Sequence, residues 1–405
     1  MIQQATEPQV LPVLIIGAGP VGLLLANLLG KSGIPVVVAE QRRSAPEWSR
    51  AIGITPPSLN IFKSLGLHET LETRGVCVDE AVVHDDRGPA GQVSFAHLDS
   101  EFRHILALPQ CETMQILTDN LARFPSVCIR RGVKLTGLKY AAQYAVAELL
   151  DSGDPDNPVK LKARWIIGCD GADSSVRHLA EINFTHRHYG PRFVMSDYDD
   201  QTDLGRGAHL YFKRDGSVES FPLPDKRRRW VVLANHMTDS SDNAAFLEDQ
   251  VAGRAGQTLV SSTRRTPVFE FTPESVAVDR MARERVILAG DAAHVMSPIG
   301  GQGMNTGFAD AELVATILPR LLDGETAEPL LAAYDRCRQR AARAARRRAA
   351  FGMWVGTRTG RISSGLRNLA VRGVMASPLA RLIPPHFAML TIPYNSADKT
   401  EIPRQ

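Results

Sequence analysis

Residues 286–305 read VILAGDAAHVMSPIGGQGMN, and the rest of the chain is organised around this stretch. The apolar run Val286–Leu288 is typical of a short buried strand. Gly290-Asp291 follows it, then the glycine-rich segment 300–305, and an amphipathic helix is predicted from about Thr306. Glycines before a helix let backbone N–H groups approach a ligand at the positive end of the helix dipole. The stretch therefore predicts one part of a ligand site.

A second motif lies near the N-terminus. The apolar strand Leu11–Ile16 leads into Gly17-Ala-Gly19-Pro20-Val21-Gly22, a helix to about Lys31, and a strand ending at Glu40. The first glycine permits a tight turn, the second admits a pyrophosphate, and the third lets the helix pack on the strand, while Glu40 suits ribose hydroxyls. This context predicts a dinucleotide site; the alternative is an ordinary βαβ turn.

A third motif is Asp170-Gly171, which follows the predicted strand Leu161–Ile167. Ser174 or Ser175 is expected to cap a helix that carries Arg177. Asp170 thus stands after a strand and before a helix, as Asp291 does.

The pattern of elements predicts an α/β fold in three parts. The apolar strands alternating with helices predict a Rossmann-like domain with a mainly parallel sheet. Short alternating strands predict an antiparallel-sheet substrate domain, and apolar helical stretches follow. We expect the dinucleotide-binding domain at 1–75, 101–180 and 273–345, the substrate domain at 76–100 and 181–272, and a C-terminal helical segment at 346–405.

Composition limits the class of protein. The chain has 405 residues, 44% of them hydrophobic, and a net charge of +3, which does not favour nucleic acid as a partner. Its five scattered cysteines include no Cys-x-x-Cys pair, which favours a reducing compartment and argues against disulfides or a metal site. We expect a cytoplasmic protein without a signal peptide or membrane span. The arginine-rich helix Glu328–Met353 predicts a solvated face or, alternatively, a contact with an anionic surface.

Together and in this order, the three motifs resemble the single-component FAD-dependent aromatic monooxygenases of the p-hydroxybenzoate hydroxylase type. The similarity covers about Val13 to Arg340. The resemblance implies FAD, with its adenosine on Gly17–Glu40, its ribityl chain near Asp291 and its ring edge on N–H groups near Gly301–Asn305. It also implies that Asp170 serves both FAD and the nicotinamide. The full predicted cofactor set is Gly17, Gly19, Pro20, Val21, Gly22, Glu40, Arg42, Arg50, Gln110, Asp170, Asp291, Gly301, Gly303, Met304 and Asn305.

The resemblance further implies an activity. NADPH or NADH would reduce the flavin, O₂ would form a flavin hydroperoxide, and an aromatic or polyketide-like small molecule would be hydroxylated. Pro298 is expected beside the substrate, and a base could be His209, Tyr211 or His236, although each could be an ordinary sheet residue. A homodimer is possible. The alternatives are a flavin-dependent reductase or dehydrogenase without oxygen transfer, and a non-catalytic flavin-binding module.

Overall fold

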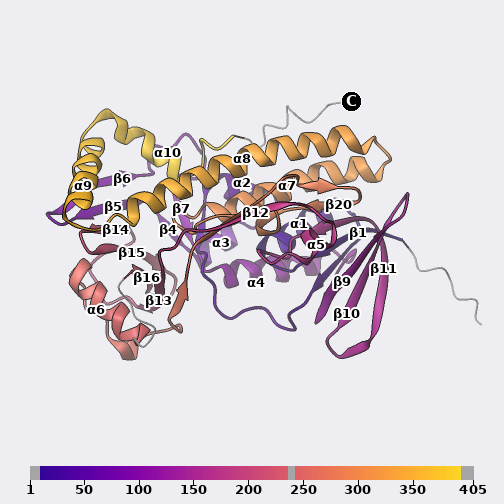
Figure 1. Cartoon of the computed structure of the whole chain (residues 1–405), viewed down its shortest axis with the longest axis horizontal. Coiled ribbons are helices and arrows are strands. Elements are labelled where there is room, and N and C mark those ends of the chain that lie inside the picture. The colour runs from indigo at the N-terminus through magenta and orange to yellow at the C-terminus, as the bar shows by residue number, and fades with distance from the viewer. Residues whose placement is uncertain (1–9, 236–241, 394–405) are drawn as a thin grey trace, which may run out of the picture.

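The centre of the molecule is a mainly parallel sheet. The computed structural model describes residues 10–235 and 242–393 (Figure 1). β1 lies between β2 and β11, and all parallel pairings of this sheet involve β1, β2, β8, β11 and β20. β9, β10 and β19 extend it in antiparallel fashion. The strands are β1 (Leu11–Ile16), β2 (Val36–Glu40), β8 (Val127–Arg131), β9 (Val133–Tyr140), β10 (Ala145–Asp151), β11 (Asp154–Gly168), β19 (Ala282–Arg283) and β20 (Val286–Leu288).

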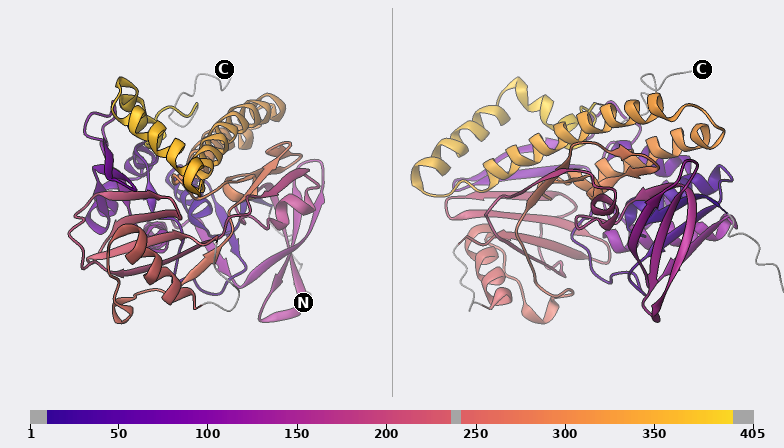
Figure 2. Two further views of the ribbon diagram at one scale, coloured as in Figure 1. Left: turned by 60° about the vertical axis from the view of Figure 1, so that its left-hand side comes forward. Right: turned by 45° about the vertical axis from the view of Figure 1, so that its right-hand side comes forward.

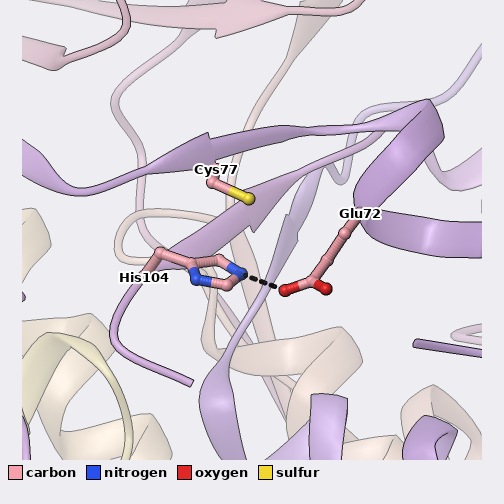
Figure 3. A group of neighbouring side chains, drawn as sticks. All are labelled: Glu72, Cys77 and His104. Atoms are coloured by element: carbon pink, nitrogen blue, oxygen red, sulfur yellow. Dashed lines mark ion pairs between the residues drawn. The ribbon is translucent and has the colours of Figure 1, made fainter. Parts of the chain in front are cut away.

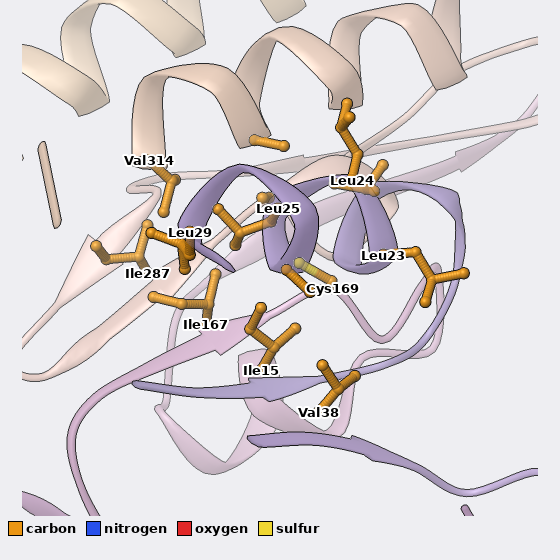
Figure 4. Close-up of a cluster of buried hydrophobic side chains, with 14 of the residues drawn as sticks. Ile15, Leu23, Leu24, Leu25, Leu29, Val38, Ile167, Cys169, Ile287 and Val314 are labelled. Atoms are coloured by element: carbon orange, nitrogen blue, oxygen red, sulfur yellow. The ribbon is translucent and has the colours of Figure 1, made fainter. Parts of the chain in front are cut away.

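Helices cover this sheet because its central strands are apolar on both faces, as parallel strands require. Leu25 and Leu29 of α1 lie over Ile15 and Ile167 in a core that also includes Val314 (Figure 4). All five side chains are fully buried, and each such burial stabilises the fold by roughly 1.5–3 kcal/mol. The helices of this region are α1 (Pro20–Lys31), α2 (Pro56–Ser64), α3 (His68–Arg74), α4 (Gln110–Asn120), α5 (Ser175–Leu179) and α7 (Gln302–Leu322).

A second large sheet has the order β17-β13-β16-β15-β14-β5-β6. The hairpin β5–β6 joins it through a parallel pairing of β5 with β14, so residues 80–94 belong to this sheet although they precede it in sequence. α6 (Asn243–Ala255) packs on one face through Leu247 and Val251. The strands are β5 (Glu80–Asp85), β6 (Gly88–Ser94), β13 (Phe193–Asp199), β14 (Ala208–Lys213), β15 (Gly216–Leu223), β16 (Arg227–Leu233) and β17 (Phe269–Phe271).

Two three-stranded sheets connect these layers. One has the order β3-β7-β4 and the other the order β12-β18-β21. β12 therefore pairs with a strand after residue 272 and does not join the substrate sheet, in contrast to the expectation for 181–272. Their strands are β3 (Gly53–Ile54), β4 (Val76–Val78), β7 (Ile105–Ala107), β12 (Phe184–His188), β18 (Glu274–Val278) and β21 (His294–Val295).

The C-terminal helices lie along one side of the molecule (Figures 1 and 2). α8 (Ala327–Gly356) is continuous, so the boundary expected at 345/346 falls inside a helix. It is followed by α9 (Arg361–Met375), the 3₁₀ helix η4 (Pro378–Leu382) and α10 (Ile383–Phe387). Among the described helices none combines the length and the apolar character needed to cross a bilayer.

Candidate functional site

The first glycine motif makes a tight turn between β1 and α1. Gly17 has φ +103°, and a Cβ there would lie 2.4 Å from the carbonyl oxygen of Cys169. A Cβ on Gly22 would lie 2.1 Å from the carbonyl oxygen of Gly17. At Gly19, by contrast, no heavy atom of a described residue outside its immediate chain neighbours lies within 4 Å of a Cβ position. Two glycines thus serve packing, whereas Gly19 leaves space beside the start of α1.

This contrast predicts different outcomes for two substitutions. Gly19→Val has room in the fold and an extended backbone (φ −73°, ψ 179°), so the thermal midpoint of the FAD-free protein should stay unchanged. The side chain fills the space beside the helix start, and FAD affinity, measured by flavin fluorescence, should fall on the order of 100-fold. Gly22→Ala should instead destabilise the FAD-free protein by about 1–3 kcal/mol. Equal loss of stability in both variants would contradict this division.

Glu40 closes the same turn from the end of β2. Its Oε2 accepts a hydrogen bond from the Ala18 N–H at 2.7 Å, and its Oε1 accepts one from the Arg42 N–H at 2.8 Å. The carboxylate is therefore fixed at the rim of the turn, where it lines a cavity together with Arg50 and Gln110.

Asp170 and Arg177 connect the Asp170-Gly171 motif to the stretch 286–305. The Asp170 carboxylate accepts hydrogen bonds from Ser174 Oγ (2.6 Å) and the Val176 N–H (3.0 Å), and burial raises its pKa. Ser174 caps α5, as one of the two serines was expected to do. Arg177 is buried and donates to the Ala292 carbonyl oxygen at 3.0 Å, which ties this motif to the segment after Asp291.

Asp310 of α7 fixes the strand-end segment at Gly290. Its carboxylate accepts hydrogen bonds from the Gly290 N–H (2.8 Å), His294 Nε2 (2.6 Å) and Arg338 Nε (2.5 Å). Burial opposes ionisation of Asp310, but His294 and Arg338 hold its pKa below the usual range. His294 is thus part of a buried ionic cluster, which accords with a structural role.

Asp291 and Asn305 differ in where they point. Asp291 lines the cavity, and its side chain is accessible from there. Desolvation by the protein around it raises the pKa of its carboxyl group. Asn305 is buried, accepts from the Thr55 N–H at 2.9 Å and donates to the Gly53 carbonyl oxygen at 2.9 Å. α7 begins at Gln302, whereas the helix was expected from about Thr306, so Asn305 lies in its first turns. The Asn305 side chain binds the backbone of residues 53–55 and does not line the cavity.

All three motifs border one cavity of about 1790 Å³. Pockets for one drug-sized ligand measure roughly 300–1,000 Å³, so this cavity has room for a large cofactor and a substrate. Of the predicted cofactor set, all members except Gly22 and Asn305 line it, and so does Pro298. The far wall is the inner face of the second sheet, and α9 together with the C-terminal end of α8 forms a further wall.

The starts of α1 and α7 suit a phosphate-bearing cofactor. Their N-cap residues are Gly19 and Gly301, neither first turn contains an acid, and within the described ranges no side chain caps either one. Among the described α-helices only α5 and α6 have a side-chain cap, Ser174 and Asp242, so α1 and α7 are set apart by their glycine N-caps at the cavity and not by the missing cap alone. Uncapped N–H groups at the positive end of a helix bind phosphate or an electronegative ring edge. With Glu40 for hydroxyls and nearby arginines, this donor set fits FAD.

His209 and Tyr211, two of the candidate bases, lie on the face of β14 that points away from the cavity. Tyr211 packs in the cluster under α6, and His209 donates to or accepts from His84 at 3.0 Å, whereas Leu210 and Phe212 line the cavity. Alternation in β14 correctly joined His209 and Tyr211 on one face, but that face turns away from the cavity. His236 lies outside the described residues.

Glu219 is the residue that sequence reasoning missed. It lies on the cavity face of β15, between its cross-strand neighbours Leu210 and Val231, both of which also line the cavity. No described residue forms a hydrogen bond or ion pair with its carboxylate, and burial raises its pKa to about 7. A lone acid within the strand sequence SVESFP was the available signal.

Arg229 also lines this wall, but its charge is matched. Its guanidinium binds Asp197 through Nε (2.6 Å) and Nη2 (2.9 Å), and Nη1 donates to the Arg50 carbonyl oxygen at 2.5 Å. The second sheet thereby holds the loop that carries Arg50, and Glu219 remains the uncompensated carboxylate of the wall.

A cluster of Glu72, Cys77 and His104 lies outside the cavity (Figure 3). His104 Nε2 is 3.2 Å from Glu72 Oε1, and the ligand-capable atoms of the three residues all lie within 4.8 Å of one another. Burial raises the pKa of the Cys77 thiol and lowers the pKa of His104, and the nearby positive charge of Arg206 opposes a cation here. We therefore assign these residues to the packing of α3 against β4 and not to a metal site.

Comparison with known proteins agrees with this geometry. The family described as the FAD binding domain matches residues 10–349. The 3-(3-hydroxy-phenyl)propionate/3-hydroxycinnamic acid hydroxylase of Mycobacterium avium (strain 104) is 29% identical over 382 residues, covering 90% of this chain and 64% of that protein. The 6-methylpretetramide 4-monooxygenase of Streptomyces rimosus is 31% identical over 341 residues, covering 82% of this chain and 59% of that protein.

The fold is also found among solved structures. The crystal structure of p-nitrophenol 4-monooxygenase from Pseudomonas putida DLL-E4 has a TM-score of 0.86 and 22% identity, covering 96% of this chain and 100% of that one. The chain spans just under two thirds of the length of the mycobacterial hydroxylase, at 64%. It belongs to the FAD binding domain family, and its architecture is that of the FAD-dependent aromatic monooxygenases.

Proposed function

We propose that the protein is an NAD(P)H- and O₂-dependent FAD monooxygenase that hydroxylates an aromatic or polyketide-like small molecule. One observation carries this proposal: a single cavity joins the helix starts at Gly19 and Gly301 to an apolar sheet wall with one uncompensated carboxylate, Glu219. The names of two relatives, which specify a hydroxyphenyl propionate and a pretetramide, support this class of substrate.

The cofactor side of the cavity is proposed to lie on the mainly parallel sheet and its helices, and the substrate side on the second sheet, including the hairpin at 80–94. Gly19 and Arg42 would receive the pyrophosphate, Glu40 the adenosine ribose, and Asp291 the ribityl hydroxyls. The helix start at Gly301 would stabilise negative charge on the ring. Because NAD(P)H is an intracellular reductant, we propose a reducing, cytoplasmic setting.

When bound, FAD would take two electrons from NAD(P)H and supply one oxygen atom of O₂ to the substrate, the other leaving as water. The protein's own contribution is binding, orientation and proton transfer. The apolar wall around Leu210 and Val231 excludes water from the reacting ring. Glu219 would accept the proton of a phenol, which raises the electron density of the ring. A carboxyl group with a pKa of about 7 suits this transfer near neutral pH.

A panel of phenols and polycyclic aromatics tests the function. The purified protein with FAD should oxidise NADPH or NADH faster when a substrate is present, and the product should contain one ¹⁸O atom when ¹⁸O₂ is supplied. Stimulated oxidation without label in the product would instead support a reductase or dehydrogenase. Failure to bind FAD at all would favour a non-catalytic role.

A further inference from the structure

The outward face of α9 is apolar. Ile362, Leu366 and Leu369 follow one another at intervals of four and three residues, so they lie on one side of the helix, and their exposed fractions are 80%, 65% and 70%. The opposite side holds the helix on the protein: Arg367 donates to the Phe212 carbonyl oxygen at 2.8 Å, and Arg372 binds Asp85. Monomeric proteins rarely expose a contiguous face of this kind without a binding role.

The end of α8 extends this surface with aromatic side chains. Phe351 and Trp354 are exposed by 63% and 51%, and the Arg358 guanidinium lies 4.4 Å from the centre of the Trp354 ring. Exposed Arg343 and Arg347 precede Phe351 at four-residue intervals on the same side of the helix. An arginine stripe therefore leads directly to the apolar surface.

The segment of the chain that forms this surface carries charge of one sign, while Asp85 and Asp86 of the β5–β6 hairpin bind Arg372 and Asn368 of α9. Residues 336–397 contain twelve arginines and no lysine, aspartate or glutamate. A second copy of the chain would bring arginines against arginines, which charge repulsion opposes. A flat anionic surface matches both the apolar face and the arginines at its edge.

The surface also surrounds a mouth of the cavity. Phe351, Trp354, Leu366 and Leu382 are exposed to solvent and line the cavity at the same time. A ligand that leaves an apolar phase at this surface would enter the cavity without crossing water.

We propose that α9, η4 and the C-terminal end of α8 dock on a lipid bilayer that contains anionic lipid. The apolar face of α9 would lie at the boundary of headgroups and acyl chains, with Arg347, Arg358 and Arg361 against lipid phosphates. α9 would lie in the plane of the interface and would not span it. This docking does not depend on the reaction proposed above.

Co-flotation of the full chain with vesicles tests the docking. Vesicles of phosphatidylcholine and phosphatidylglycerol (1:1) should carry the protein at least roughly tenfold better than phosphatidylcholine alone. Leu366→Asn with Leu369→Asn should abolish flotation. Arg347→Gln with Arg361→Gln should weaken binding to the anionic vesicles roughly 20- to 30-fold, at about 1 kcal/mol per arginine. Val260→Asn, which changes a 43% exposed apolar residue elsewhere, should float like the wild type.

Three results would overturn the proposal, provided that each variant keeps the thermal unfolding midpoint of the wild type. The wild type could stay unbound with both vesicle types. The leucine variant could bind as well as Val260→Asn. Light scattering could reveal a dimer that the leucine variant converts to a monomer, which would assign the surface to a second copy.

Discussion

Glu219→Gln should lower the rate of aromatic hydroxylation by roughly 100-fold or more at pH 7.5, because general base catalysis typically contributes 10²–10⁴-fold. Glutamine keeps the size of the side chain but cannot accept the phenol proton. Burial raises the pKa of Glu219 to about 7, so kcat/KM of the wild type should rise as the pH increases through about 7. The pH profile of the variant should lack this step. Steady-state rates between pH 5.5 and 8.5 measure both effects.

The same substitution should stabilise the protein at high pH. The pKa of Glu219 is about 7 in the folded chain, against an ordinary value of 4.5, so the folded state binds its proton more tightly than the unfolded state. The free energy of unfolding therefore falls between pH 4.5 and 7 and stays lower above pH 7. Removing the charge should restore up to about 3 kcal/mol at pH 8 and nothing at pH 4.

Glu270→Gln is the matched control, since Glu270 lies on the same sheet but is exposed and faces Arg192 at 3.2 Å. It should leave the rate, the pH profile and the stability close to those of the wild type. If Glu219→Gln had the kcat/KM of the wild type, Glu219 would not be the base.

Asp310→Ala should destabilise the protein by about 3–5 kcal/mol, because it leaves Arg338 buried without its carboxylate. The Gly290 N–H and His294 Nε2 lose their acceptor as well, so the segment that carries Asp291 is released. Urea denaturation of the FAD-free protein measures the loss of stability. FAD affinity should fall in parallel, since Asp291 is proposed to hold the ribityl chain.

Glu101→Ala provides the comparison, because its ion pair with Lys63 is exposed on both sides. Exposed pairs contribute about 0–1 kcal/mol, so this variant should unfold near the wild-type midpoint. If Asp310→Ala cost no more than Glu101→Ala, the buried cluster would not hold α7 and α8 together.

The sequence was sufficient for the parts of the site that depend on local backbone geometry. The turn at Gly17–Gly22, the acid at the end of β2 and the cap at Ser174 are each specified within a few residues. The strand and helix that follow β1 were predicted for the same reason, since an apolar run before spaced glycines has few other solutions.

The side chains of the second sheet that line the cavity could not be predicted in the same way. Alternation in a strand tells which side chains share a face, but not which face meets the cavity. α6 packs on one face of the second sheet and the other face lines the cavity, so neither His209 nor Glu219 lies on a face that points to bulk solvent. Only the long-range pairing of β5 with β14, and the packing of α6, decide the direction.

The boundary expected at 345/346 cuts the helix that was itself expected at Glu328–Met353. In the structure α8 continues to Gly356 because alanines and Met353 keep its inner side buried. Charge on the outer side of a helix says little about where the helix ends.

The two uncapped helix starts at Gly19 and Gly301 also affect the protein before any chemistry occurs. Glycine in place of a capping side chain costs only a few tenths of a kcal/mol, and the chain accepts this cost at both helix starts of the proposed cofactor site. A ligand that binds those N–H groups in the folded state shifts the folding equilibrium toward that state by mass action. The amount of intact protein in a cell should consequently follow the supply of flavin, with newly made chains most vulnerable to proteases when that supply is short.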